Sequence, residues 1–494
     1  MEKYYHSTRN KKVQALPKEA VLAGLASDGG LFVLDDLDQI SLPLADMMKM
    51  DYAQLARCVM GVLLFDYSEA ELDECIRLAY QGQFDDEAIT PLVHSGKDHI
   101  LELFHGPTSA FKDVGLRMLP QLMSVALKKE KDARVMILTA TSGDTGKAAM
   151  AGFQDVDRVG ITVFYPDHGV SEIQRLQMVT QQGENTFAVA MKGNFDDAQS
   201  GVKQIFHDVD YQSGFKTKGI QFSSANSINI GRLAPQVVYY FDAYRQMVQC
   251  NQIRFGDVID FCVPTGNFGN VLAGYYAKLM GLPIRKLIVA TNANHVLYDF
   301  LTTGVYDRNR PFYKTISPSM DILISSNLER LLYDVSGCDT AYVQSLMADL
   351  QTKGRYCVSQ AILAKIQETF AVGYASDDQC RAVMKAKYEA DQYVLDPHSA
   401  CAYVAMRECA DENIPCVLLA TASPYKFCGS VSEALFGEQE SDEFAMMDAL
   451  ETRTHIQAPK LLKQLRSMPI RHQDVIERSE MKSIISQKVG VLWQ

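Results

Sequence analysis

The sequence lacks the features that would assign it to a membrane, an exported or a nucleic-acid-binding class. No apolar run approaches the roughly 20 residues that span a bilayer as a helix. The first residues, Met1 to Ser7, contain no apolar segment of the kind that directs export, so a cytoplasmic location is expected. The formal net charge of −12 disfavours binding to nucleic acid and to a membrane surface.

Metal-ligand spacings and disulfide signatures are also missing. The 10 histidines are dispersed without H-E-x-x-H or H-x-H spacing, and the 11 cysteines form no C-x-x-C pair. Cys262 and Cys416 lie within apolar, strand-like runs and are interpreted as reduced core residues. We therefore expect neither a structural nor a catalytic metal.

The composition is that of an ordinary globular protein, with 47% apolar and 22% charged residues and a single tryptophan. A chain of 494 residues exceeds one hydrophobic core, so two or three domains are expected.

Strand and helix patterns alternate between about residues 130 and 300. The expected strands are 135–138, 159–164, 187–191, 220–222, 258–263 and 287–290, and the expected helices between them are 172–182, 197–207, 233–248 and 271–280. This alternation predicts an α/β fold with parallel strands and helices on both faces, in which ligands gather at the carboxyl ends of the strands.

The flanking regions have a different character. Helical patterns at 18–26, 52–64 and 68–80 predict a mainly helical N-terminal domain. After the last predicted strand, 416–420, an acidic stretch at 436–451 leads to a C-terminal tail, which is expected to pack back on the domain.

The segment from His105 to Asp113 contains the first candidate for chemistry. Lys112 follows a Gly-Pro turn and begins an apolar, helix-like run. A lysine withdrawn from water favours the neutral amine, which can act as a nucleophile. The alternative is a lysine with a buried stem and a charged head in water.

Two glycine-containing loops follow predicted strands. Pro264 to Asn270 links a strand to a helix, and such a turn places backbone N–H groups and the positive helix end around one point, as a phosphate requires. Thr139 to Lys147 has the same position after another strand and would suit a carboxylate. The alternative for either loop is a tight βα turn that binds nothing.

The second loop does not form a Walker A motif. The position five residues before Gly146 is Thr141 where that motif needs glycine, and Lys147 is followed by Ala148 where it needs Ser or Thr. A nucleotide-binding α/β protein is therefore disfavoured.

Together these segments resemble the threonine synthase family, of the longer-chain fungal and bacterial type. The resemblance covers nearly the whole chain, and its motifs occur in the family's order. They are Tyr4 to Arg9, Gly24 to Val33, Gly106 to Asp113, Thr141 to Lys147, Asn226 to Asn229 with Arg232, Pro264 to Asn270, Asp396 to Ala400 and Thr421 to Phe427.

The resemblance implies an α/β fold-type II pyridoxal-phosphate (PLP) enzyme, similar to the tryptophan synthase β subunit. Two open α/β subdomains would hold the cofactor between them, with an additional mainly helical domain. The implied division is residues 1–90 for the N-terminal domain, 91–430 for the catalytic region and 431–494 for a C-terminal segment. The implied reaction converts O-phospho-L-homoserine and water into L-threonine and phosphate, in a monomer or a homodimer.

The resemblance also assigns roles to individual residues. Lys112 would carry PLP covalently and move protons, and the hydroxyl of Thr421 would face the pyridine nitrogen. The cofactor phosphate would be bound by Gly266, Asn267, Phe268, Gly269 and Asn270. The substrate carboxylate would be bound by Thr141, Ser142, Gly143, Asp144 and Thr145, with Asp144 orienting the loop as a helix N-cap. The substrate phosphate would be bound by Asn226, Ser227, Asn229 and Arg232.

One motif departs from the family pattern. Ser423 and Tyr425 stand where the family usually has His and Ala, which predicts a phenol close to the cofactor ring. Two alternatives to a threonine synthase stay open: a related PLP-dependent phospho-lyase that releases an oxo acid and ammonia, and a non-catalytic homologue that binds the cofactor or a metabolite. The presence of Lys112 argues against the second.

Overall fold

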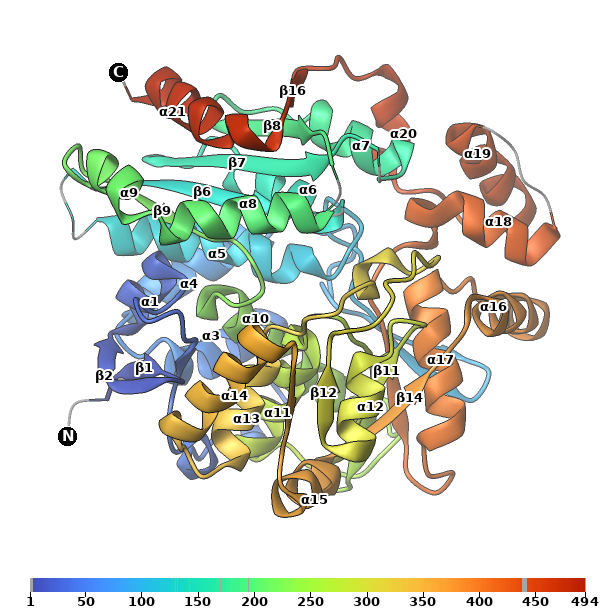
Figure 1. The fold of residues 1–494 in the computed structure, drawn as a ribbon. Coiled ribbons are helices and arrows are strands. Elements are labelled where there is room, and N and C mark those ends of the chain that lie inside the picture. The colour runs from blue at the N-terminus through green and yellow to red at the C-terminus, as the bar shows by residue number, and fades with distance from the viewer. Residues whose placement is uncertain are drawn as a thin grey trace.

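The computed structural model describes residues 3–493 apart from 129, 131, 142, 169, 194 and 438–441. The predicted site residue Ser142 therefore lies outside the described residues. Two helix-covered sheets form an upper and a lower half, and the N-terminal residues pack beside them (Figure 1). Within the described ranges, no helix combines the length and the apolar character that crossing a membrane requires.

The upper half is built on a five-stranded sheet of order β16-β8-β7-β6-β9, and every neighbouring pair of strands is parallel. Its strands are β6 (Arg134–Ala140), β7 (Val159–Pro166), β8 (Thr186–Met191), β9 (Ile220–Ser223) and β16 (Asp474–Ile476). Met136 and Leu138 pack against helices on one face, whereas Val135 and Ile137 pack into the core on the other. Burial on both faces explains why these strands read as continuous apolar runs.

Helices cover both faces of this sheet (Figure 1). Those of the upper half are α5 (Lys112–Leu127), α6 (Asp144–Phe153), α7 (Glu172–Val179), α8 (Phe195–His207), α9 (Val209–Lys216) and α21 (Met481–Leu492). Helices α8 and α21 share one apolar cluster with the sheet, and α5 and α6 share the other.

The lower half is built on a six-stranded sheet of order β14-β11-β10-β15-β5-β4. Its strands are β4 (Leu92–Ser95), β5 (Asp98–Glu102), β10 (Ile259–Pro264), β11 (Ile284–Thr291), β14 (Phe370–Tyr374) and β15 (Cys416–Ala420). Among the described strand pairs of this sheet, β4 and β5 are antiparallel and the others are parallel. Phe261 and Val263 face α10 (Ile230–Gln249) and α11 (Gly269–Leu279), whereas Cys262 faces α17 (Pro397–Cys409).

Outside the N-terminal residues, the remaining helices and strands complete the described part of the chain. They are α12 (Val296–Thr303), β12 (Val305–Asp307), α13 (Leu328–Val335), α14 (Thr340–Lys353), β13 (Arg355–Cys357), α15 (Gln360–Thr369), α16 (Asp377–Asp391), α18 (Cys428–Phe436), α19 (Glu443–Thr454) and α20 (Lys460–Gln464).

The N-terminal residues form helices and a small antiparallel sheet of order β2-β1-β3. The elements are β1 (Tyr5–Ser7), β2 (Asn10–Ala15), α1 (Pro17–Ala23), β3 (Phe32–Val33), α2 (Leu44–Met47), α3 (Tyr52–Leu63) and α4 (Glu69–Tyr80). Asp51 and Ser68 cap α3 and α4, each accepting a hydrogen bond from the third residue of its helix. These caps fix where the two helices begin.

The predicted α/β alternation is confirmed, since each predicted strand between residues 130 and 300 is present with slightly different bounds. The mainly helical character of the N-terminal part is also confirmed, and a small antiparallel sheet accompanies its helices. The lower sheet is parallel, as expected, except for its edge strand β4. The C-terminal residues contribute β16 to the edge of the upper sheet, beside β8.

The crossing of α5 and α6 supplies a test of packing. A Cβ added to Gly152 would lie 2.0 Å from the carbonyl oxygen of Leu116, so Gly152→Ala must push the two helices apart. We expect this variant to lose about 1–3 kcal/mol of unfolding free energy in chemical denaturation. Gly490→Ala in α21 is the matched control, because no described residue outside the local helix backbone comes within 4 Å of the added Cβ. This control should be neutral or slightly stabilising; equal stability of the two variants would contradict the packing argument.

Candidate active site

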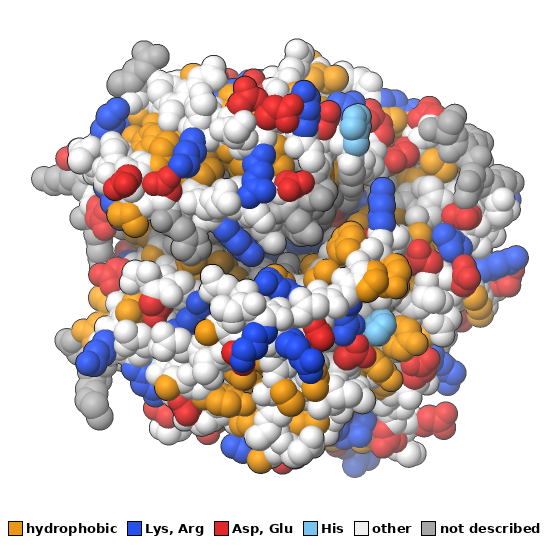
Figure 2. Space-filling model, viewed as in Figure 1, with side chains coloured by type: hydrophobic (Ala, Val, Ile, Leu, Met, Phe, Trp, Pro, Cys, Tyr) orange, Lys and Arg blue, Asp and Glu red, His pale blue; other side chains and the backbone are white. Residues whose placement is uncertain are grey.

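A cavity of about 1500 Å³ lies between the two halves, where the carboxyl ends of both sets of strands meet. Figure 2 shows the molecule hollowed at this place, with Lys and Arg side chains along the hollow. Strands β6, β10 and β15 each lead into a loop that lines the cavity. The fold therefore brings the three predicted loops together, as expected for parallel α/β sheets.

Lys112 is the first residue of α5 and lines the cavity. The turn before it is fixed from both sides: Asp113 accepts hydrogen bonds from the backbone N–H and the hydroxyl of Thr108, at 2.8 and 2.7 Å. The carbonyl oxygen of Thr421, just after β15, accepts a bond from Phe111 N at 2.8 Å. These contacts hold Lys112 and Thr421 on neighbouring segments of one wall.

The Lys112 amine is largely withdrawn from water, with 10% of its side chain exposed. Its Nζ lies 3.3 Å from Ser319 Oγ and 3.5 Å from Asp144 Oδ2. Burial lowers the pKa of Lys112; Asp144 opposes this effect, and the charges of Lys426 and Arg232 add to it. The surroundings therefore favour the neutral amine, which agrees with the predicted nucleophile.

Asp144 begins α6 but is neither its N-cap nor free to receive an anionic ligand. The N-cap position is Gly143, and the Thr141 hydroxyl accepts bonds from the N–H groups of Gly143 and Gly146. Although burial opposes it, Lys426 and Lys112 hold the pKa of Asp144 well below its usual range. The expectation that Asp144 binds the substrate carboxylate needs correction, because its ionised oxygens face lysine amines.

The loop after β10 has the features of a phosphate site. Phe268 has a left-handed backbone (φ 63°), which turns the chain into the N-terminus of α11. A Cβ on Gly266 would lie 2.7 Å from the Ser319 carbonyl oxygen, so only glycine fits there. Asn270 Oδ1 accepts from Tyr239 and Tyr240, and its buried Nδ2 has no hydrogen-bond partner among the described residues. A donor-rich helix N-terminus of this kind fits the phosphate of PLP.

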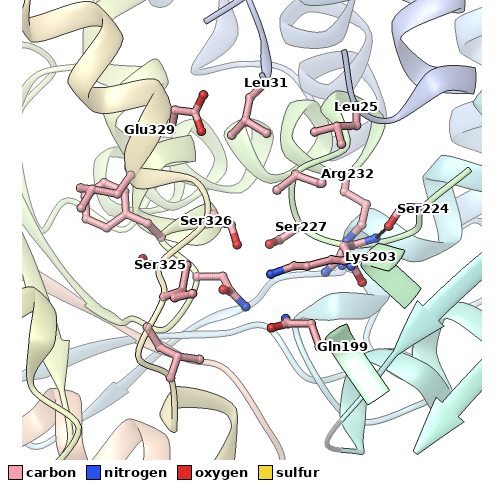
Figure 3. A pocket seen from close by; sticks show the side chains of 18 of the residues that line it. Leu25, Leu31, Gln199, Lys203, Ser224, Ser227, Arg232, Ser325, Ser326 and Glu329 are labelled. Atoms are coloured by element: carbon pink, nitrogen blue, oxygen red, sulfur yellow. Dashed lines mark hydrogen bonds between the residues drawn. The ribbon is translucent and has the colours of Figure 1, made fainter. Parts of the chain in front are cut away.

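A second group of polar residues also lines the cavity. Arg232, from the first turn of α10, is buried, and burial lowers its pKa to about 10. One guanidinium nitrogen, Nη1, donates to the Ala225 carbonyl at 2.9 Å, whereas the buried Nε has no partner in the part of the chain that the structure describes. Figure 3 shows Arg232, Ser227 and Lys203 directed toward the same part of the pocket. Asn226 also lines it.

Two predicted site residues in the described part of the chain, Asn229 and Gly143, do not line the cavity. The Asn229 side chain caps α10 through Gly231 N and donates to the carbonyl oxygens of Val21 and Ser224. The prediction that Asn229 contacts substrate is therefore not supported: its amide is occupied, and it positions the helix that carries Arg232. Gly143 has a φ of 137°, and a Cβ there would lie 2.6 Å from the Gln174 side chain.

The predicted phenol near the cofactor ring also needs correction. Tyr425 is buried, and its hydroxyl donates to the Ile456 carbonyl in the C-terminal residues. Ser423 Oγ accepts from Tyr425 N at the start of a short 3₁₀ turn, Pro424–Phe427. Among the described residues, both lie outside the cavity lining, whereas Thr421 belongs to it.

Several residues of the site were not predicted. Ser319 reaches the cavity from a loop; its hydroxyl donates to Asp144 Oδ2 at 3.3 Å and its N–H to His398 Nε2 at 3.1 Å. Gln174 Nε2 donates to Asp144 Oδ1 at 3.1 Å. Lys203 enters from α8. No local motif marks these three residues, since their part in the site comes from tertiary contacts.

Family models match the chain in three consecutive parts. "Threonine synthase N terminus" matches residues 4–80, "Pyridoxal-phosphate dependent enzyme" residues 85–419, and "Threonine synthase, C-terminal" residues 399–485.

The chain is similar to curated and structurally characterised proteins over most of its length. It is 39% identical to human "Threonine synthase-like 1", covering 95% of this chain but only 63% of that protein. It is 40% identical to threonine synthase from Pseudomonas aeruginosa, covering 88% of this chain and 91% of that protein. The crystal structure of PLP-bound threonine synthase from Brucella melitensis superposes with a TM-score of 0.87, at 36% identity and 99% coverage of each chain. The chain therefore belongs to the threonine synthase family of pyridoxal-phosphate-dependent enzymes.

Proposed function

We propose that this protein is a threonine synthase that converts O-phospho-L-homoserine and water into L-threonine and phosphate. The observation that carries the proposal is one cavity lined by a buried lysine amine and by two groups of hydrogen-bond donors that suit anions. One is the loop Gly266 to Asn270 and the other surrounds Arg232. A phosphorylated cofactor and a phosphorylated substrate would need two such sites.

Lys112 would attach PLP covalently, and the N–H groups of Gly266 to Asn270 with Asn270 Nδ2 would bind its phosphate. Thr421 would face the pyridine ring. When bound, PLP supplies an electron sink for bonds broken at Cα and Cβ of an amino acid. Lys112 Nζ, once displaced by the substrate amine, would take the proton from Cα and return protons later in the reaction. A lowered pKa of Lys112 suits both steps, since the neutral amine accepts the proton and the ammonium formed from it returns the proton.

The substrate would lie between the two halves of the protein. Arg232 would bind its phosphate, because a guanidinium presents a fork of donors, and Asn226, Ser227 and Lys203 would complete that site. Thr141 and Thr145 would bind the carboxylate, together with Ser142 from outside the described residues. Gly143 would act indirectly by shaping the turn of this loop. Asn229 would act indirectly by capping the helix that carries Arg232.

The division into residues 1–90, 91–430 and 431–494, and a monomeric or homodimeric state, are also proposed. The first boundary is supported by the family models, which leave residues 81–84 between two matched parts.

Product analysis tests the proposed reaction. Purified protein loaded with PLP should form L-threonine and phosphate in equal amounts from O-phospho-L-homoserine. Release of an oxo acid and ammonia with phosphate, without threonine, would contradict the proposal and identify a phospho-lyase.

The role of Lys112 has a direct chemical test. Borohydride reduction should trap a phosphopyridoxyl group on the peptide that contains Lys112, as identified by mass spectrometry. Lys112→Ala should fold but lose turnover by several orders of magnitude, because the nucleophile and the proton carrier are the same group. Labelling of another lysine would overturn the assignment.

Arg232→Lys should separate substrate binding from cofactor binding. Replacing a fork of donors by a point charge should raise KM for O-phospho-L-homoserine by about tenfold or more, while the affinity for PLP changes little. The exposed Arg355→Lys is the matched control and should leave KM unchanged. An unaltered KM in Arg232→Lys would remove Arg232 from the phosphate site.

A further inference from the structure

Two buried lysines share one carboxylate at the inner end of the cavity. Lys426 Nζ lies 2.8 Å from Asp144 Oδ1, and Lys112 Nζ lies 3.5 Å from Asp144 Oδ2. The side chains of Lys426, Asp144 and Lys112 are 0%, 3% and 10% exposed. With both amines protonated, this cluster would hold a net positive charge away from water, which is unfavourable.

The contacts of the two amines differ. Lys426 Nζ has a second acceptor, the carbonyl oxygen of Thr108, at 2.8 Å, so its ammonium is bonded on two sides. Among the described residues, Lys112 Nζ has longer polar contacts, to Ser319 Oγ at 3.3 Å and to Asp144 Oδ2 at 3.5 Å. The shorter, charge-assisted bonds therefore fix the Lys426 ammonium beside Asp144 more tightly than they hold Lys112.

Lys426 is also held in place by the backbone around it. It lies in the 3₁₀ turn Pro424–Phe427 after β15 and connects the turn before α5, through Thr108, with the start of α6, through Asp144. Gln174 and Ser319 fix the carboxylate from other directions. Lys426 itself is not among the described residues that line the cavity.

We propose that Lys426 is a positioning residue whose fixed positive charge, held on the far oxygen of Asp144, favours the neutral, nucleophilic form of Lys112. It acts through Asp144 and touches neither cofactor nor substrate. The inference rests on the proposed function only in taking Lys112 as the reactive amine.

The charged and titratable groups that face this cluster come from four helices. They are Asp113 from α5, Asp144 and Lys147 from α6, Arg232 from α10 and His398 from α17. Burial lowers the pKa of Lys112, Asp144 raises it, and Lys426 and Arg232 lower it. Removing the Lys426 charge takes away one lowering effect and leaves Lys112 as the lysine that is paired with Asp144. The pKa of Lys112 should then rise, so that Lys112 keeps its proton to higher pH.

The test compares Lys426→Met, which removes the charge, with Lys426→Arg, which keeps it. The full-length protein, freed of PLP, is acetylated with limiting acetic anhydride between pH 6 and 10, and labelling of Lys112 is measured by peptide mass spectrometry. Lys49, whose side chain is 82% exposed, is the internal reference. A second readout is the pH titration of the visible absorption band of the PLP-loaded protein.

In Lys426→Met, the labelling midpoint of Lys112 should move upward by about one pH unit, which is about a tenfold loss of labelling below the midpoint. The absorption titration should move in the same direction. Lys426→Arg should keep both midpoints near the wild-type positions, even if its turnover falls. Unmoved midpoints in Lys426→Met, or equal displacement in both variants, would overturn the proposal.

Loss of folding in Lys426→Met is checked by circular dichroism and addressed with the double variant Lys426→Met/Asp144→Asn, which removes both partners of the buried pair. Without the carboxylate, the Lys112 midpoint should return toward the wild-type value, and a persistent upward displacement would contradict the proposal. Labelling does not depend on threonine formation. A protein that makes no threonine but shows these displacements would therefore contradict the proposed function and support the inference.

Discussion

The buried carboxylate of Asp144 is the interaction on which the site depends. It brings together residues from four separate segments: Lys112 from α5, Gln174 from α7, Ser319 from a loop and Lys426 from the turn after β15. A charge withdrawn from water is tolerated only when its partners are fixed around it. Asp144 needs hydrogen-bond and ion-pair partners because it is buried. These partners join the upper half, which carries α6, to segments of the lower half that would otherwise only face it across the cavity.

The two proposed anion sites of the cavity are built from different kinds of groups. Backbone groups dominate at the loop after β10, where glycines allow close approach and a helix begins. Side chains dominate around Arg232, whose position is set by the Asn229 cap and by the Ala225 carbonyl. Backbone sites are rigid and suit a resident group, whereas long side chains can adapt to a ligand that comes and goes.

Much of the fold and part of the site could be predicted from the sequence. The strands from β6 to β11 read clearly because burial on both faces makes them continuously apolar. Lys112, Gly266 and Thr141 could be predicted because each follows a turn or strand signal that the fold places at one edge. In contrast, β2 (Asn10–Ala15) is short and mostly polar, so it carries no strand pattern.

The residues that escaped prediction act through contacts over long sequence separations. Ser319 meets Lys112 across 207 positions, and Lys426 meets Thr108 across 318. The Tyr425 phenol was wrongly expected near the cofactor, because spacing alone does not show which way a side chain points from a buried turn. Asn229 was assigned to substrate for the same reason, although its amide serves the chain itself.

The position of β16 in the sheet has a consequence for how the protein folds during its own translation. This strand, Asp474–Ile476, forms the edge of the upper sheet beside β8 (Thr186–Met191), although nearly 300 residues of chain lie between them. During translation, β8 must wait with an open edge until the chain has been synthesised as far as β16. Open strand edges are where nascent chains associate wrongly. A strand made nearly 300 residues later thus closes the sheet edge that β8 leaves open.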